Sequence, residues 1–184
     1  AETGGAEGGA RMAPEIAALP GREQMEEINQ QILYEQGVHD LVLGFLERHT
    51  AGADTNPGAF APEQLEVFRL CFLFLYYFVL DHDSTAEALS TQSTLRLLFQ
   101  QLEWWPGTEV ISVLAEILVD NDPANQLLDD GDVMLMVSLL FQDIRKCIGA
   151  QHAGEKANWT RATKLLELIE SVIESDEGPI MARQ

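Results

Sequence analysis

A short acidic segment occurs twice in this chain, and this internal repeat constrains the fold more than any other feature of the sequence. LDHDSTAEAL (80–89) aligns with VDNDPANQLL (119–128) at an offset of 39, with two aspartates ahead of a short helical pattern in each copy. The patterns that follow also pair, because TLRLLFQQL (94–102) resembles MVSLLFQDI (136–144) at an offset of 42. Units that repeat in this way stack on one another to bury a continuous core.

A period of about 40 residues, with a long helix, a short helix and another long helix in each unit, is typical of armadillo and HEAT repeats. No segment alternates polar and apolar residues over the length of a strand. The sequence therefore predicts an all-α fold, an armadillo/HEAT-like right-handed helical solenoid of about three to four repeats. We expect its helices at about residues 22–36, 38–49, 62–80, 84–90, 93–105, 108–119, 123–128, 132–148 and 158–174.

The two ends of the chain differ in their expected organisation. The Gly-rich, acidic residues 1–21 are expected to be a disordered leader or a remnant of cloning. Residues 22–184 are expected to form the armadillo-like repeat domain. After the break at Gly178-Pro179, IMARQ (180–184) resembles the start of a further helix, so the chain is interpreted as a fragment of a larger protein.

The acidic residues of the repeated segment raise the question of a metal or catalytic site. Asp81 and Asp83 flank His82 in the first copy, and Asp120 and Asp122 recur in the second. A metal site has no need of a copy in every repeat, and the spacing of a calcium-binding EF-hand loop is absent. Carboxylates at a helix start accept hydrogen bonds from free amides and favour the positive end of the helix dipole. We therefore predict that the four aspartates cap helix corners and that no metal is bound.

The pair Trp104-Trp105 lies just before a Pro-Gly helix break. One interpretation is that the rings pack between neighbouring repeats. The other is that they contact a partner helix, because exposed tryptophan is a frequent anchor of interfaces.

The charge of the chain limits its partners. Thirty acidic residues against eleven basic ones give a net charge of −19. Such a surface repels phosphate backbones and anionic lipids, so nucleic acid is excluded as a partner. The most apolar run, LCFLFLYYFVL (70–80), is shorter than the roughly 20 residues of a membrane-spanning helix. We expect no direct membrane insertion, and we predict that the helix from about Pro62 to Leu80 is the buried spine of the solenoid.

Chemistry-bearing residues are scattered. The four histidines have no paired ligand spacing, and they are His39, His49, His82 and His152. Cys71 and Cys147 lie among apolar residues at helical spacing, which indicates buried free thiols and a reducing compartment. No nucleophile elbow or phosphate-binding glycine loop is present in the sequence. The sequence predicts a protein that is not an enzyme and that uses no cofactor.

The order of segments resembles the RIH domain, the homology region shared by ryanodine receptors and inositol trisphosphate receptors. The resemblance is carried by QQILYEQGVHDLVLGFLE (30–47), by EVFRLCFLFLYYFVLDHDSTAEALSTQSTLRLLFQQL (66–102) and by ATKLLELIESVIESDEGPIMARQ (162–184). It extends over about residues 30–184 and rests on pattern and order rather than on an invariant signature.

The resemblance implies a scaffolding and conformational-coupling solenoid in the cytosolic assembly of an endoplasmic-reticulum calcium-release channel. Its partners would be neighbouring domains or subunits of that assembly, and its location would be cytoplasmic. Binding of inositol trisphosphate does not carry over, because Asp81, His82, Asp83 and Ser84 stand where such a receptor supplies basic residues. The alternative is a free-standing armadillo-like adaptor that binds a peptide or a partner helix.

Overall fold

The internal repeat folds as three units of three helices each. The computed structural model describes residues 22–50 and 60–174. The first unit holds α1 (Arg22–Glu35), α2 (Val38–Thr50) and α3 (Pro62–Val79), and the second holds α4 (Asp83–Leu89), α5 (Gln92–Trp104) and α6 (Glu109–Leu118). The third unit holds α7 (Asp122–Asn125), α8 (Asp130–His152) and α9 (Thr160–Glu174).

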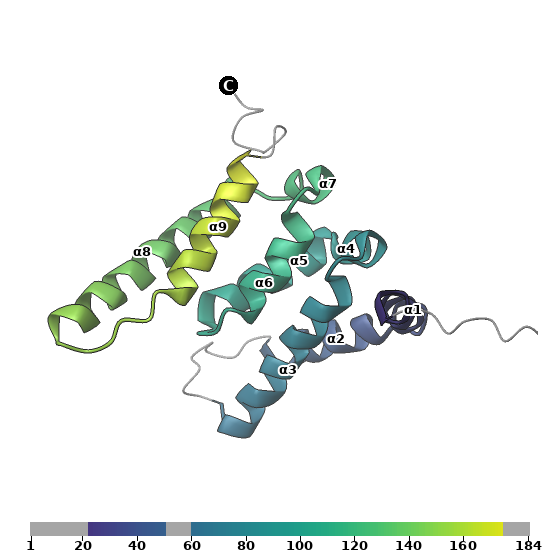
Figure 1. Ribbon diagram of the computed structural model, residues 1–184, viewed down its shortest axis with the longest axis horizontal. Coiled ribbons are helices and arrows are strands. Elements are labelled where there is room, and N and C mark those ends of the chain that lie inside the picture. Colours follow the sequence, from purple (N-terminus) through teal and green to yellow (C-terminus); the bar gives the residue numbers. More distant parts are fainter. Residues whose placement is uncertain (1–21, 51–59, 175–184) are drawn as a thin grey trace, which may run out of the picture.

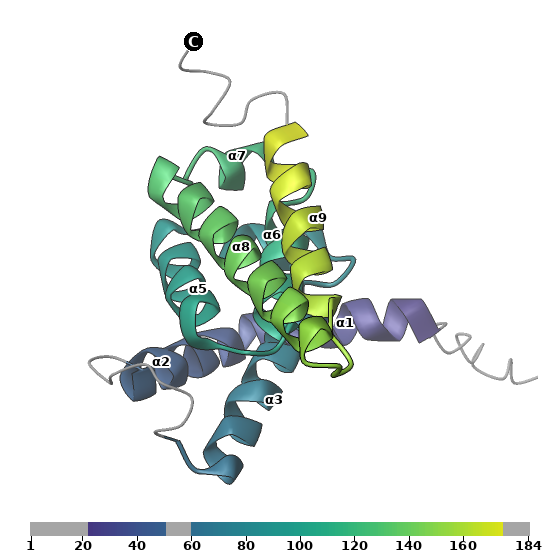
Figure 2. The same cartoon turned by 90° about the vertical axis from the view of Figure 1, so that its left-hand side faces the viewer.

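Corresponding helices of successive units pack on one another. The third helices α3, α6 and α9 contact in that order, the second helices α2, α5 and α8 do the same, and α1 contacts α4. Figure 2 shows α2 and α5 on one side of the stack, α3 and α6 on the other, and α8 and α9 nearest the viewer across its end. In the side view of Figure 1 the stack begins at α1–α3 and ends at α8–α9.

The all-α prediction is confirmed, since the described residues contain helices and no strand. Each expected helix is present there within a few residues. The largest difference is α8, which continues through Gly149 to His152, and Gly154 then adopts a φ of 78° at its end. That left-handed conformation suits glycine, so the later glycine ends the helix. The right-handed twist remains a prediction, and the expectations for residues 1–21 and 180–184 lie outside the described residues.

The prediction that the helix from Pro62 to Leu80 is the buried spine is wrong. On α3 a set of apolar side chains is exposed, namely Val67, Leu70 and Tyr77. The central helix is α6, whose large apolar residues are all buried: Val110, Ile111, Val113, Leu114, Ile117 and Leu118. The reason is position, because α6 has a third helix on either side, whereas α3 has one only on the side of α6.

Buried polar contacts join the units as well. Gln101 of α5 donates a hydrogen bond from Nε2 to Oγ1 of Thr50 in α2 over 2.9 Å, and both residues are buried. Within the described part of the chain, no helix is long and apolar enough to cross a membrane.

Candidate interaction surfaces

The two acidic corners have the same backbone. Asp81 has a φ of 55° and Asp120 a φ of 53°, and they are the only non-glycine residues with positive φ in the described chain. Aspartate tolerates this left-handed conformation better than most residues because its short polar side chain can bond locally. The first aspartate of each corner therefore turns the chain out of one helix and toward the next.

The capping side chain is the middle residue of each corner, so the prediction that the aspartates cap is wrong in this respect. Nδ1 of His82 accepts a hydrogen bond from the Thr85 amide over 3.3 Å, at the start of α4. Oδ1 of Asn121 accepts the equivalent bond from the Ala124 amide over 3.1 Å, at the start of α7.

The aspartates flank these caps. Asp83 and Asp122 occupy the first position of their helices, where a carboxylate favours the positive end of the helix dipole. Asp81 and Asp120 precede the capping residues, and in both copies of the repeat they form the left-handed turn. The physical reason for the difference is that the side chain directly before a helix is the one that reaches its free amides.

Each corner is also tied to the helix before it. Oγ1 of Thr85 donates to the Phe78 carbonyl over 2.7 Å, and Nδ2 of Asn125 donates to the Leu118 carbonyl over 2.9 Å. Both side chains are buried, so they supply the hydrogen bonds that carbonyl groups at a helix end would otherwise need from water. Asn121 also donates from Nδ2 to Oγ of Ser90, which joins the second corner to the end of α4.

A hollow of about 750 Å³ lies between the two corners. Its acidic lining residues are Asp81, Asp83, Glu87, Glu116 and Asp120, and no Lys or Arg lines it. Burial, with the charge of Asp81 as a smaller cause, raises the pKa of the Glu116 carboxyl above its usual value. Among the described residues, no group of three or more His, Cys, Asp or Glu side chains is placed to hold a metal ion.

Trp104 and Trp105 are both buried, so the interpretation that they are exposed for contact with a partner helix does not fit their position. Trp104 lies against Phe60 and Phe68, and Trp105 lies edge-on to Phe72. The indole Nε1 of Trp105 donates a hydrogen bond over 3.0 Å to the carboxylate of Glu109, the first residue of α6. The alternative interpretation, packing between repeats, is the one the contacts support.

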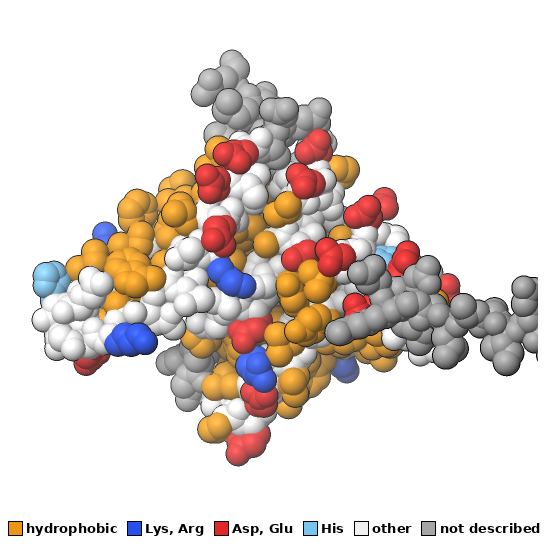
Figure 3. All heavy atoms as spheres, viewed as in Figure 1, with side chains coloured by type: hydrophobic (Ala, Val, Ile, Leu, Met, Phe, Trp, Pro, Cys, Tyr) orange, Lys and Arg blue, Asp and Glu red, His pale blue; other side chains and the backbone are white. Residues whose placement is uncertain are grey.

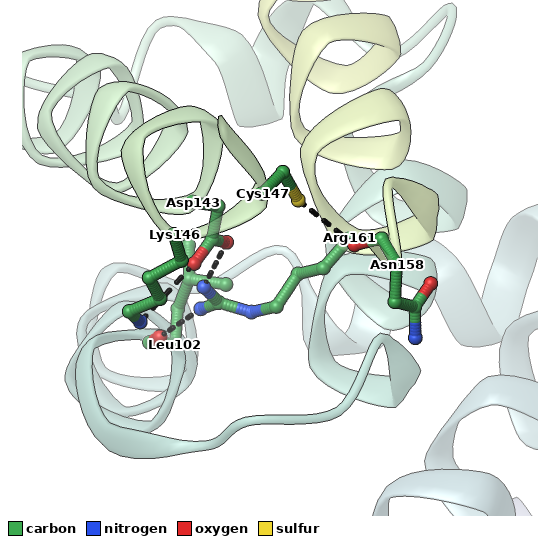
Figure 4. Close-up of polar contacts among 6 residues, drawn as sticks. All are labelled: Leu102, Asp143, Lys146, Cys147, Asn158 and Arg161. Atoms are coloured by element: carbon green, nitrogen blue, oxygen red, sulfur yellow. Dashed lines mark hydrogen bonds and ion pairs between the residues drawn. The ribbon is translucent and has the colours of Figure 1, made fainter. Parts of the chain in front are cut away.

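An ion pair joins the two long helices of the last unit, and its arginine also bonds to the second unit (Figure 4). Arg161 of α9 donates from Nη1 to Oδ2 of Asp143 in α8, and from Nη2 to the Leu102 carbonyl of α5 over 2.9 Å. Lys146, whose side chain is exposed, donates to Oδ1 of the same carboxylate over 3.3 Å. Next to this cluster, Cys147 donates from Sγ to the Asn158 carbonyl. The cluster lies inside an interface between helices and therefore has a structural role.

The outer side of the last unit is apolar and exposed. We call this surface the last-unit face, and it consists of Met134, Phe141 and Ile148 on α8 with Leu166 and Ile173 on α9. Figure 3 shows hydrophobic side chains gathered along α8 and beside α9. On each helix the residues recur every seventh position, which keeps them on one side.

The internal repeat explains what this face would contact. Phe99 of α5 and Phe141 of α8 are equivalent at the offset of 42, and Phe99 is 2% exposed whereas Phe141 is 58% exposed. On the third helices, Ile111 and Leu118 are buried, whereas Leu166 and Ile173, their equivalents at an offset of 55, are exposed. In the second unit, the third unit therefore covers this side of the helices. In the third unit, the equivalent side is exposed.

The opposite end of the stack is also apolar. We call this surface the first-unit face, and it consists of Val67, Leu70, Cys71, Phe74 and Tyr77 on α3, of which Cys71 and Phe74 are half-buried. At the offset of 39, Cys71 and Phe74 correspond to Val110 and Val113, which are fully buried on α6. Sequence reasoning missed both faces, although the repeat alignment contains the signal, since the terminal units keep apolar residues where no neighbour follows.

A family model described as the RIH domain matches residues 19–183 of the chain. No match was found among curated proteins or among solved structures.

Proposed function

Because this chain belongs to the RIH-domain family, whose model matches residues 19–183, we propose that it is a helical-repeat scaffold that couples conformational change between neighbouring domains of a larger calcium-release channel. The RIH domain is a non-catalytic receptor domain, and it is cytosolic in the channels that contain it. A place on the cytosolic side of the endoplasmic reticulum and a repeat domain spanning residues 22–184 are parts of the same proposal.

The observation that carries the proposal is the pair of apolar faces at the two ends of the stack. Solenoids that end in water have terminal repeats with polar outer sides. Here Phe141 and Leu166 at one end, and Leu70 and Tyr77 at the other, are exposed apolar side chains. Two ends of this kind favour a unit that is packed between neighbours, and a unit packed at both ends transmits displacement because close-packed interfaces deform little.

Hydrogen–deuterium exchange tests the proposal. The amide exchange of α3, α8 and α9 is compared between the isolated chain and the complete channel protein. We expect slower exchange of these helices in the channel, while the central helix α6, already covered on both sides, changes little. Equal exchange of α8 and α9 in both samples would contradict a role as a packed scaffold unit.

The alternative, a free-standing adaptor, is favoured by the acidic hollow between the corners. Its lining of five carboxylates without a Lys or Arg suits a basic segment. A lysine-rich helical peptide is the appropriate probe, with Glu116→Lys as the variant expected to abolish binding. A peptide affinity unchanged by that substitution would exclude the hollow as the adaptor site.

A further inference from the structure

We propose that copies of this chain associate head to tail, with the last-unit face of one copy packed on the first-unit face of the next. This inference rests on the proposed scaffold role and names its partner, a second copy of the same domain.

The two faces are the two sides of one repeating interface. On α6, the side equivalent to the first-unit face holds Val110 and Val113, and the side equivalent to the last-unit face holds Ile111 and Leu118. All four are buried because α3 and α9 lie on either side of α6. A last-unit face brought against Cys71 and Phe74 of a first-unit face would therefore repeat part of the contact that α6 makes with its neighbours. The exposed Val67, Leu70 and Tyr77, which correspond to Pro106, Glu109 and Glu116 at the offset of 39, would add apolar surface to that contact.

The charges beside Phe141 and beside the first-unit face are opposite, whereas the α9 part of the last-unit face carries the exposed Glu167, Glu170 and Glu174. The first unit, residues 22–81, has ten acidic and three basic residues. Residues 145–164 of the last unit have one acidic residue, Glu155, and five basic ones, which are Arg145, Lys146, Lys156, Arg161 and Lys164. Arg161 pairs with Asp143, and Lys164 donates to Ser112. The exposed positive charge of this segment therefore lies on Arg145, on Lys156 and on Lys146, which also contacts Asp143. The net charge of the chain is −19, and this basic segment is complementary in charge to the acidic first unit of a second copy.

The hollows beside the two faces are complementary in character. Between α1 and α3 a hollow of about 730 Å³ is lined by apolar residues, Phe74 and Tyr77 among them, and by the carboxylates of Glu26, Glu27 and Asp81. On α8 the surface at Phe141 is bordered by Arg145 and Lys146. An aromatic ring with two cations beside it suits an apolar floor with three carboxylates around it.

When the last-unit face of one copy packs on the first-unit face of another, the dimer still has one free first-unit face and one free last-unit face. Association therefore continues beyond the dimer, either into an open chain or into a closed ring. A contact of one face with its own copy would stop at the dimer. This difference makes the mode of association measurable.

Sedimentation velocity across a concentration series tests the inference. Phe141→Glu blocks the last-unit face. Leu70→Arg blocks the first-unit face, because the added cation would meet Arg145 and Lys146 of the next copy. Both positions are exposed, so folding is retained and is checked by circular dichroism. Val119→Glu is the matched control, because Val119 is an exposed apolar residue beside the corner hollow and outside both faces. We expect the wild type and the control to form oligomers. We expect each face variant to associate at least about tenfold more weakly, since a charge would be buried without a partner.

Mixing the two face variants is the decisive measurement. Each retains the face that the other lacks, so an equimolar mixture forms a one-to-one dimer and nothing larger. A wild type that is monomeric at every concentration, or a mixture that remains monomeric, would overturn the inference. In either case, slower exchange of α8 and α9 in the complete channel would still support the scaffold role, with a different neighbour.

Discussion

At the scale of single residues, each corner uses one residue for the turn and the next residue for the helix cap. Asp81 and Asp120 take the left-handed turn, and His82 and Asn121 cap the helices that follow. The recurrence of aspartate was visible in the sequence, but which residue faces the helix amides depends on the backbone angles of the corner. A change at a cap and a change at a turn therefore have different costs.

Asn121→Ala is expected to lower the free energy of unfolding by about 0.5–2 kcal/mol, the usual cost of removing an N-cap. The neighbouring Asp120→Gly should change it little, because glycine adopts the positive φ of that position without strain. Urea unfolding of both variants measures the difference. If Asp120→Gly lowered the free energy of unfolding more than Asn121→Ala did, the aspartate rather than the asparagine would be the capping residue.

Glu116 gives a pH-dependent prediction. Burial and Asp81 raise the pKa of its carboxyl above the usual 4.5, so the folded protein holds this proton more tightly than the unfolded chain does. Its stabilising contribution is present below 4.5 and is lost as the pH rises through the folded-state pKa. Glu116→Gln, which has no charge to desolvate, should therefore raise the Tm at neutral pH, and the gain should shrink in acid.

The control for this measurement is Glu103→Gln on α5, which removes the same charge outside the hollow. Thermal unfolding of both variants is followed by circular dichroism from neutral to acid pH. A gain in Tm that is equal for the two variants would assign the effect to net charge rather than to the place of Glu116.

At the scale of helices, α3 and α6 show how position decides burial. The sequence of α3 is more continuously apolar near its end, yet α6 is the helix buried on both sides. Apolar content indicated that α3 needs neighbours, and among the described residues α3 has the third helix of another unit, α6, on one side only.

Truncations on the two sides of α3 should differ sharply. Phe72→Ala or Leu75→Ala removes a fully buried side chain and is expected to cost roughly 2–5 kcal/mol. Leu70→Ala, on the exposed first-unit face, should cost about 0.5 kcal/mol or less. Melting temperatures of the isolated chain test this. If Phe72→Ala kept the wild-type melting temperature, the packing of α3 on α6 would be wrong.

Arg161 gives a prediction for the packing of α8 and α9. Arg161→Met leaves the buried Asp143 carboxylate with the exposed Lys146 as its ion-pair partner, and we expect a loss of about 3–5 kcal/mol. Lys146→Met should cost about 1 kcal/mol or less, as exposed ion pairs do. Adding Asp143→Leu to Arg161→Met should recover much of the loss. No recovery in denaturant unfolding would mean that the arginine acts through Leu102 or through packing alone.

At the scale of the whole molecule, the distribution of charge gives a ligand prediction. The corner hollow is lined by carboxylates, and the exposed Arg145 and Lys146 lie on α8, outside that hollow. A triply phosphorylated ligand needs several converging Lys or Arg groups. Inositol trisphosphate should therefore not bind the isolated chain, and calorimetry at low salt is the appropriate measurement because screening is weakest there. Binding in the micromolar range or tighter would restore a ligand-binding role.

The sequence by itself determined the helical class, the approximate limits of the helices and the repeat, because these depend on local spacing and on glycine and proline breaks. It also indicated the family through the order of its segments. It did not determine that His82 rather than Asp81 caps α4, since backbone angles at a corner depend on how the two helices pack. Nor did it separate Phe99 from Phe141, which have the same local pattern, because only the stacking of units covers one and leaves the other exposed.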